Sequence, residues 1–164
     1  MNETVILRHN KIDLALHILR AEPLDASVPS RPLLLLHGLG DRSPDSVPHW
    51  VAAWPGPVAA LDFTGHGEST VPAGGGYSPE TLMADVDQAL AHLTDGDPDR
   101  SITVLGRGLG AYVALQIAGA RAGQIPGAIL TDGPGLAGGP TGPTSQSVFA
   151  LDTDGSSPDP YALV

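Results

Sequence analysis

Three closely spaced glycines, Gly106, Gly108 and Gly110, interrupt an apolar stretch that runs over residues 104–118. A strand that turns sharply into a helix needs small residues at the turn, because the backbone must fold back without Cβ clashes. Two kinds of site use such a turn. In G-x-S-x-G the central residue is a nucleophile held on a strained bend. In G-x-G-x-x-G/A the glycines let a pyrophosphate approach the N-terminus of a helix.

The glycine spacing fits each pattern in part. For the nucleophile pattern, Gly106 and Gly110 occupy the outer positions, but Gly108 stands where the serine is required. For the dinucleotide pattern, Gly106, Gly108 and Ala111 are in register, and Asp132 follows about 20 residues later, where an acid binds ribose hydroxyls. That pattern commonly opens its domain, whereas strands and polar turns precede it here. The glycines alone leave both interpretations open.

Two further polar turns carry residues able to do chemistry. One turn, residues 37–41, reads HGLGD, and the other, which we call the histidine turn, residues 62–69, reads DFTGHGES. Each follows a short predicted strand, residues 32–36 and residues 58–62, and the first of these is continuously apolar. Continuous apolarity is typical of a strand covered on both faces, as in a parallel sheet. The sequence therefore predicts that both turns lie at the ends of buried strands.

The remaining elements alternate around these turns. Apolar runs predict a hairpin over residues 4–19 and further strands over residues 102–105 and 128–131. Ser78, Pro79 and Glu80 form a typical helix start, followed by apolar residues at helical spacing with Asp85 on the polar side. A second helix over residues 109–120 is apolar nearly all round, hence predicted to be buried, and a short helix over residues 47–54 places Trp50 and Trp54 on one face. This alternation predicts an α/β fold with a mostly parallel sheet.

Composition excludes several classes of function. The 164 residues make one domain or part of one. A formal net charge of −10 argues against nucleic-acid partners and against binding to anionic membranes. No cysteine is present, so thiolate metal sites are excluded, and no apolar run approaches the roughly 20 residues that span a bilayer. The first ten residues lack a basic region followed by an apolar core, so a cytoplasmic protein is expected.

The last part of the sequence differs from the rest. Residues 133–164 are rich in Gly, Pro and Ser, with an apolar island at residues 148–151. Asp159 and Pro160 resemble a helix start that the sequence cuts off. We therefore interpret residues 1–132 as the N-terminal part of a domain and residues 133–164 as a tail, the start of a lid or C-terminal part in a truncated product or N-terminal fragment.

Three segments in this order resemble the α/β-hydrolase superfamily: LLLLHGLGD at residues 33–41, LDFTGHGES at residues 61–69 and LGRGLG at residues 105–110. They are similar to the family's third strand with its oxyanion turn, its fourth strand with its D-x-x-G-H-G-x-S turn, and its nucleophile elbow. The resemblance covers about residues 5–132. It implies a mostly parallel central sheet with helices on both faces, lacking the family's C-terminal strands.

The resemblance also implies roles for individual residues. In the family, the elbow residue attacks an acyl carbon and is activated by a His that an Asp or Glu orients. The nucleophile position is Gly108, which has no reactive side chain. Asp132 occupies a position where some relatives place the acid, and no His follows His92 in the sequence. The backbone amides of Leu39 and Leu109 would form the oxyanion hole. The other motif positions are expected to be structural: His37, Gly38, Asp62, Gly65, His66, Gly67, Gly106 and Gly110.

These expectations combine into one hypothesis and two alternatives. The hypothesis is an α/β-hydrolase-fold pseudoenzyme that keeps an oxyanion site for a small-molecule ester or anion and needs no cofactor or metal. One alternative is a dinucleotide- or phosphate-binding module built on residues 106–111. The other is a fragment of an esterase-like hydrolase. The oligomeric state and the substrate are not predicted.

Overall fold

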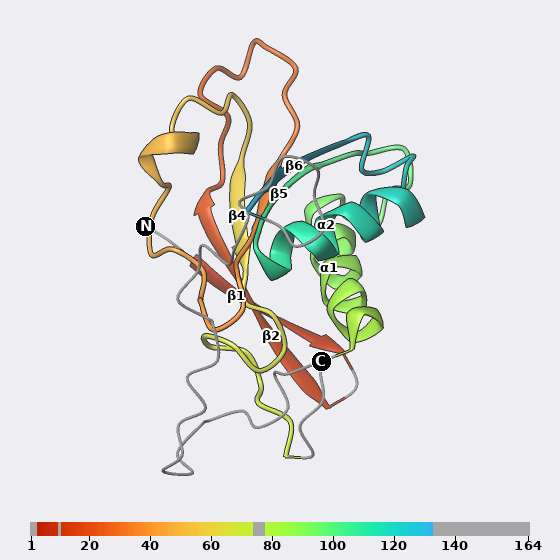
Figure 1. Cartoon of the computed structure of the whole chain (residues 1–164). Coiled ribbons are helices and arrows are strands. Elements are labelled where there is room, and N and C mark those ends of the chain that lie inside the picture. Colours follow the sequence, from red (N-terminus) through yellow and green to blue (C-terminus); the bar gives the residue numbers. More distant parts are fainter. Residues whose placement is uncertain (1–2, 10, 74–77, 133–164) are drawn as a thin grey trace.

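A six-stranded sheet forms the centre of the protein (Figure 1). The computed structural model describes residues 3–9, 11–73 and 78–132. The spatial strand order is β1-β2-β4-β3-β5-β6. The bounds are β1 Glu3–His9, β2 Ile12–Arg20, β3 Leu33–Leu36, β4 Val58–Leu61, β5 Thr103–Arg107 and β6 Gly127–Thr131. β1, β2 and β4 pair antiparallel, whereas β4, β3, β5 and β6 run parallel. The predicted hairpin and mostly parallel sheet are confirmed.

The central strands are buried on both faces. All four leucines of β3 are buried, and Leu34 and Leu36 pack on one side of the sheet while Leu33 and Leu35 pack on the other. β4 divides in the same way, because side chains alternate along a strand. This two-sided burial explains why the two strands read as unbroken apolar runs.

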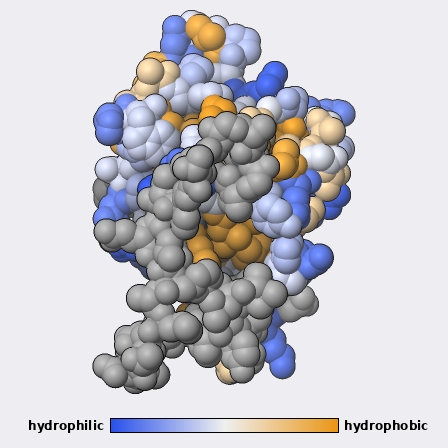
Figure 2. All heavy atoms as spheres, in the orientation of Figure 1, coloured by the Kyte–Doolittle hydropathy of each residue, from blue (hydrophilic) through white to orange (hydrophobic). Residues whose placement is uncertain are grey.

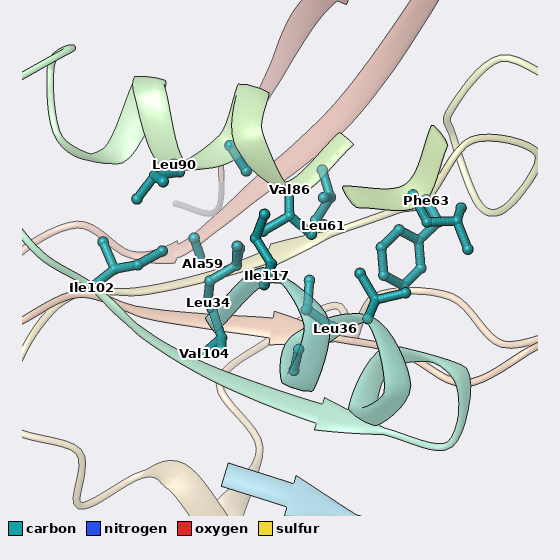
Figure 3. Close-up of a cluster of buried hydrophobic side chains, with 14 of the residues drawn as sticks. Leu34, Leu36, Ala59, Leu61, Phe63, Val86, Leu90, Ile102, Val104 and Ile117 are labelled. Carbon is teal, nitrogen blue, oxygen red and sulfur yellow. The ribbon is translucent and has the colours of Figure 1, made fainter. Parts of the chain in front are cut away.

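Two α-helices cover one face of the sheet (Figures 1 and 3). They are α1, Pro79–Leu93, and α2, Leu109–Ala120. The predicted start of α1 is confirmed: Pro79 is its first residue, and the Ser78 side chain accepts a hydrogen bond from the Thr81 amide. Figure 3 shows side chains of both helices meeting those of the strands, including Val86 from α1 and Ile117 from α2.

The opposite face is covered by a shorter element. η1, a 3₁₀ helix at His49–Val51, replaces the longer helix predicted over residues 47–54. Pro55 disfavours a helical conformation at Trp54, which leaves too few residues for an α-helix after Pro48. The prediction that the two tryptophans share a face is wrong. Trp54 packs against the buried apolar cluster on this face of the sheet, which contains Leu33 and Leu35, whereas Trp50 is 56% exposed.

Arg20 fixes the segment that carries η1 to the sheet. Its guanidinium donates hydrogen bonds to the carbonyls of Ala52 (3.1 Å), Trp54 and Gly56 (2.7 Å). Helices thus lie on both faces of the sheet, as predicted. Both α-helices share one face, and the 3₁₀ helix lies on the other.

α2 is less buried than its composition indicates. Its inner side packs on β5 and β6, but Tyr112 and Leu115 on its outer side are exposed. The prediction of burial all round is wrong, because no described element lies outside α2. Figure 2 shows that hydrophobic residues also gather in one area of the face that it presents. Within the described ranges, no helix is long and apolar enough to cross a membrane.

Candidate active site

The elbow, residues 106–110, joins β5 to α2 by a sharp turn. Gly108 lies at its apex with φ 56° and ψ −118°, a conformation that side-chain-bearing residues adopt only under strain. Its amide donates to the Thr131 carbonyl (3.0 Å), and its carbonyl accepts from the Ala111 amide (3.1 Å). The turn is thus held by β6 on one side and by the first turn of α2 on the other.

Glycine occupies the three elbow positions for different reasons. A Cβ on Gly106 would lie 2.2 Å from the Gly110 carbonyl oxygen, and one on Gly110 would lie 2.3 Å from the Leu36 carbonyl oxygen. Neither position has room for any side chain. Among the described residues, a Cβ on Gly108 would meet only the Gly38 Cα, at 3.4 Å. The apex therefore has space for a side chain, and its only obstacle is the positive φ.

The oxyanion turn, residues 37–41, lies against the elbow. The Gly110 amide donates to the His37 carbonyl (3.0 Å), and a Cβ built on Gly108 would lie 3.4 Å from the Gly38 Cα. Leu39 lies in this turn, and Leu109 is the first residue of α2, where an amide has no acceptor within the helix. The positive end of the α2 dipole is at the same place. The structure thus brings together the two turns that carry the predicted oxyanion amides.

His37 ties the oxyanion turn to the histidine turn. Its Nδ1 donates to the Gly38 carbonyl (2.7 Å), and its Nε2 accepts from the Phe63 amide (3.1 Å). Burial lowers the pKa of His37, which favours this neutral form. Because both ring nitrogens are occupied, His37 fixes the relative position of the two turns and is not placed to act as a base.

Asp62 holds the start and end of the histidine turn. Its carboxylate accepts from the amides of Ser43 (2.7 Å) and Glu68 (2.9 Å) and from His17 Nε2 (2.9 Å). Burial opposes ionisation of Asp62, but these hydrogen bonds outweigh it and hold the pKa below its ordinary value. Gly67 is required here, because a Cβ would lie 2.0 Å from the Asp62 carboxylate and its φ is +52°.

The middle of the histidine turn is anchored on α1. Asp85 accepts hydrogen bonds from the amide (2.8 Å) and the hydroxyl (3.0 Å) of Thr64. Gly65 follows with a positive φ of 81°, and the His66 ring lies 5.0 Å from that of His37, with Nδ1 3.1 Å from the Thr64 carbonyl.

The placement of Asp85 on the polar side of its helix is wrong, because its side chain is buried against Thr64. Burial raises the pKa of Asp85 to about 6, although the hydrogen bonds from Thr64 oppose this shift. The helical spacing gives no sign of this contact, which joins segments 21 residues apart. His17 was also missed, although a polar residue within an apolar strand was an available signal.

Asp132 lies at the end of β6 beside the elbow. It has a positive φ of 51°, and its carboxylate is 3.8 Å from Arg107 Nε. Within the described part of the chain, no imidazole forms a hydrogen bond with Asp132. The arrangement is an acid next to an arginine at the edge of the elbow, without the His that an acid of a catalytic triad would orient.

A cavity of about 730 Å³ opens beside the oxyanion turn and the elbow. Its walls are mostly apolar and come from the ends of β3 and β5, from Thr131 and from the segment around η1. Polar groups enter it from the oxyanion turn and the elbow. Its lining includes His37, Gly38, Asp41, Arg42, Leu105 and Arg107. Its size and mixed lining suit a small organic molecule.

Comparison with known proteins decides between the interpretations of this site. Residues 27–151, most of the chain, match the profile of the serine aminopeptidase family S33. The chain belongs to this family. As an S33 α/β-hydrolase, it aligns with lipase LipV of Mycobacterium tuberculosis at 40% identity over 76 residues, which is 46% of this chain and 27% of LipV.

Solved structures agree with this assignment. The thioesterase domain of the curacin biosynthetic pathway superposes with a TM-score of 0.68 at 26% identity, covering 84% of this chain and 48% of that one. A putative lipase from Acinetobacter baumannii gives 0.65 at 22% identity, covering 83% and 43%. The chain thus spans less than half the length of these relatives.

Family membership does not favour the dinucleotide interpretation of the glycines. The elbow explains Gly110 as well as Gly106, because both are excluded from carrying a side chain by the backbone packed on them. A tail or lid over residues 133–164 lies outside the described residues.

Proposed function

We propose that this chain binds small acyl compounds at the elbow, as an ester carbonyl or a carboxylate, without forming the covalent intermediate that a serine makes. The observation that carries this proposal is Gly108: the apex keeps the strained bend and the neighbouring oxyanion turn, but has no nucleophile. In this respect the protein is a pseudoenzyme that retains an oxyanion hole.

The local electrostatics support binding of a negative or strongly polar oxygen. Backbone amides at a helix N-terminus favour such groups whatever their side chains are. Leu39 and Leu109 supply these amides in the proposal, and the positive charge of Arg107 at the edge of the elbow is balanced in part by the carboxylate of Asp132, 3.8 Å away. The apolar walls of the adjacent cavity provide space for the body of the ligand.

A second candidate follows from the length of the relatives. Because the solved relatives are about twice as long, this chain is also compatible with being part of an esterase-like hydrolase. In that case the rest of the protein would supply a base, and Gly108 would still exclude a serine route at this position. We place the protein in the cytoplasm, and fractionation of cells expressing the full chain tests this.

A proline substitution tests the amide site directly. Leu109→Pro removes the proposed donor at the first helical position, where proline is tolerated. Leu109→Ala keeps the amide and removes only the side chain. In ¹⁵N spectra, butyrate is expected to shift the Leu39 amide signal of the native chain and of Leu109→Ala, but not of Leu109→Pro. Equal shifts in the two variants, or none in the native chain, would contradict the proposal.

Active-site labelling tests the absence of a nucleophile at the elbow. A fluorophosphonate probe reacts with an activated serine, so peptides that contain residues 106–112 are expected to stay unlabelled. Mapping by peptide mass spectrometry separates this outcome from labelling elsewhere in the chain. A label within residues 106–112 would overturn the assignment of Gly108 as an inert apex.

A further inference from the structure

His17 lies between a buried carboxylate and an exposed hydroxyl. Its Nε2 is 2.9 Å from Asp62 Oδ2, and its Nδ1 is 3.0 Å from Thr4 Oγ1. Thr4 and His17 are direct partners across the β1–β2 hairpin. Exposure increases along the series, because Asp62 is 2% exposed, the His17 side chain 16%, and Thr4 lies on the surface.

The hydrogen bonds fix the direction of each proton. Asp62 also accepts from the amides of Ser43 and Glu68, and these bonds stabilise its ionised form. An ionised carboxylate only accepts, so His17 Nε2 must carry a proton and donate it. In the neutral imidazole, Nδ1 then has the free lone pair. The Thr4 hydroxyl therefore donates to His17 Nδ1.

This arrangement has the order of groups that activates a nucleophile. Such a site needs a hydroxyl within hydrogen-bond reach of a base, and a third group that orients the base. Thr4, His17 and Asp62 meet these conditions. By contrast, His37 has both nitrogens bound to backbone groups.

The three residues line a second cleft that contains no residue of the elbow; it adjoins the larger cavity, with which it shares Arg42, Ser43 and Pro44. It has a volume of about 170 Å³, enough for a small acyl group but not for a long chain. Its wall contains Asp45 and Glu68 besides Asp62, and one cation, Arg42, which is 3.3 Å from Asp45. This excess of carboxylates disfavours an anionic acyl donor.

We propose that Thr4 is a nucleophilic hydroxyl that accepts the acyl group of small uncharged esters, with His17 as its general base and Asp62 as the positioning residue for His17. Thr4 Oγ1 bonds to the ester carbonyl carbon while its proton passes to His17 Nδ1. The bond between that carbon and the leaving oxygen then breaks. The products are O-acyl-threonine and an alkoxide or phenolate, which takes up the proton from His17 or from water. This activity is independent of the proposed binding at the elbow.

Acetylation by p-nitrophenyl acetate tests the proposal on the full chain. Peptide mapping is expected to find acetyl-Thr4, and alkaline hydroxylamine should remove it because it is an ester. Lys11 is the only lysine in the sequence, so background acetylation of amines is limited to Lys11 and the N-terminus, and it resists hydroxylamine.

Ser27 provides a control within the same molecule. It is exposed, and its hydroxyl donates to a carboxylate, Asp25 Oδ1 (2.6 Å), without an imidazole. Thr4 is expected to be acetylated about a hundredfold faster than Ser27, the lower end of what a positioned general base contributes. This comparison needs no variant and so does not depend on refolding.

Two variants separate the base from the fold. His17→Gln keeps an amide donor for Asp62 but removes the base, so acetylation of Thr4 should fall to the rate of Ser27. Thr4→Val keeps the shape of the side chain and should abolish the hydroxylamine-sensitive acetyl group at residue 4. Equal rates at Thr4 and Ser27 in the native chain, or an unchanged rate in His17→Gln, would overturn the proposal.

Discussion

At the scale of single residues, the elbow glycines differ in what a side chain would cost. Gly106→Ala places a Cβ 2.2 Å from the Gly110 carbonyl oxygen, so the β5–α2 contact must shift, and Gly110→Ala places one 2.3 Å from the Leu36 carbonyl oxygen, so α2 must shift away from β3. Within the part of the chain that the structure describes, the Cβ of Gly108→Ala meets only the Gly38 Cα at 3.4 Å, and the positive φ costs about 1–3 kcal/mol. Urea denaturation should therefore rank Gly108→Ala as the mildest of the three. A milder Gly106→Ala would contradict the close packing.

Gly108→Ser tests whether a nucleophile alone restores covalent chemistry. The side chain fits, but the neighbouring imidazole of His37 has both nitrogens engaged and Asp132 pairs with Arg107. We expect the variant to fold and its new serine to react no faster with a fluorophosphonate than an ordinary surface serine. Rapid labelling at position 108 would reveal a base at the elbow and disprove this expectation.

Asp85 is expected to make stability depend on pH in an unusual direction. Its pKa is raised from 3.8 to about 6 in the folded protein, so between these values the folded state holds a proton that the unfolded chain has lost. Its contribution to stability therefore falls as the pH rises through this window and is lost above about pH 6.

Asp85→Asn is the variant that isolates this effect. Asparagine can accept from the Thr64 amide and donate to its hydroxyl, so the anchor of the histidine turn is kept. The fall in the free energy of unfolding between pH 3.8 and about 6 should be smaller in the variant, by about 2–3 kcal/mol. Denaturant titrations at several pH values measure the free energy of unfolding. If this free energy changes with pH equally in both proteins, Asp85 is not the group responsible. The pKa of Asp62 is lowered, so its contribution to stability changes only in more acidic solutions, below the window of Asp85.

At the scale of elements, the sequence predicts the strands and helix ends that are determined by neighbouring residues in the chain. β3 and β4 are read from their apolar runs, and the start of α1 from its capping residues. The two turns follow because the carboxyl ends of parallel strands meet at one edge of the sheet. The elbow is recognised from glycine spacing, since the same close approach of backbones is needed wherever this turn occurs.

Other features depend on contacts between distant segments and were not predictable. The burial of Asp85 depends on Thr64, and the pairing of His17 with Asp62 depends on the register of β2 on β4. In each case the residue type is visible in the sequence, but its partner is supplied by the three-dimensional fold.

At the scale of the whole molecule, the two edges that the sheet has within the described residues, β1 and β6, differ in how they resist association. Unpaired edge strands are sites of intermolecular pairing unless charges or other devices block them. β1 carries Glu3, Arg8 and His9, and Arg8 forms an ion pair with Asp13. β6, with the sequence GAILT, has no charge, and Ile129 is 41% exposed. Association of this chain should therefore begin at β6.

A pair of matched lysine substitutions tests this difference between the edges. Ile129→Lys places a charge on the unprotected β6, whereas Ile6→Lys adds the same charge to β1, where Ile6 is similarly exposed at 53%. Because both changes alter the net charge equally, a general effect on solubility cancels. Light scattering at increasing protein concentration should show less association for Ile129→Lys than for Ile6→Lys or the native chain. If both lysines suppress association equally, overall charge rather than the β6 edge controls it.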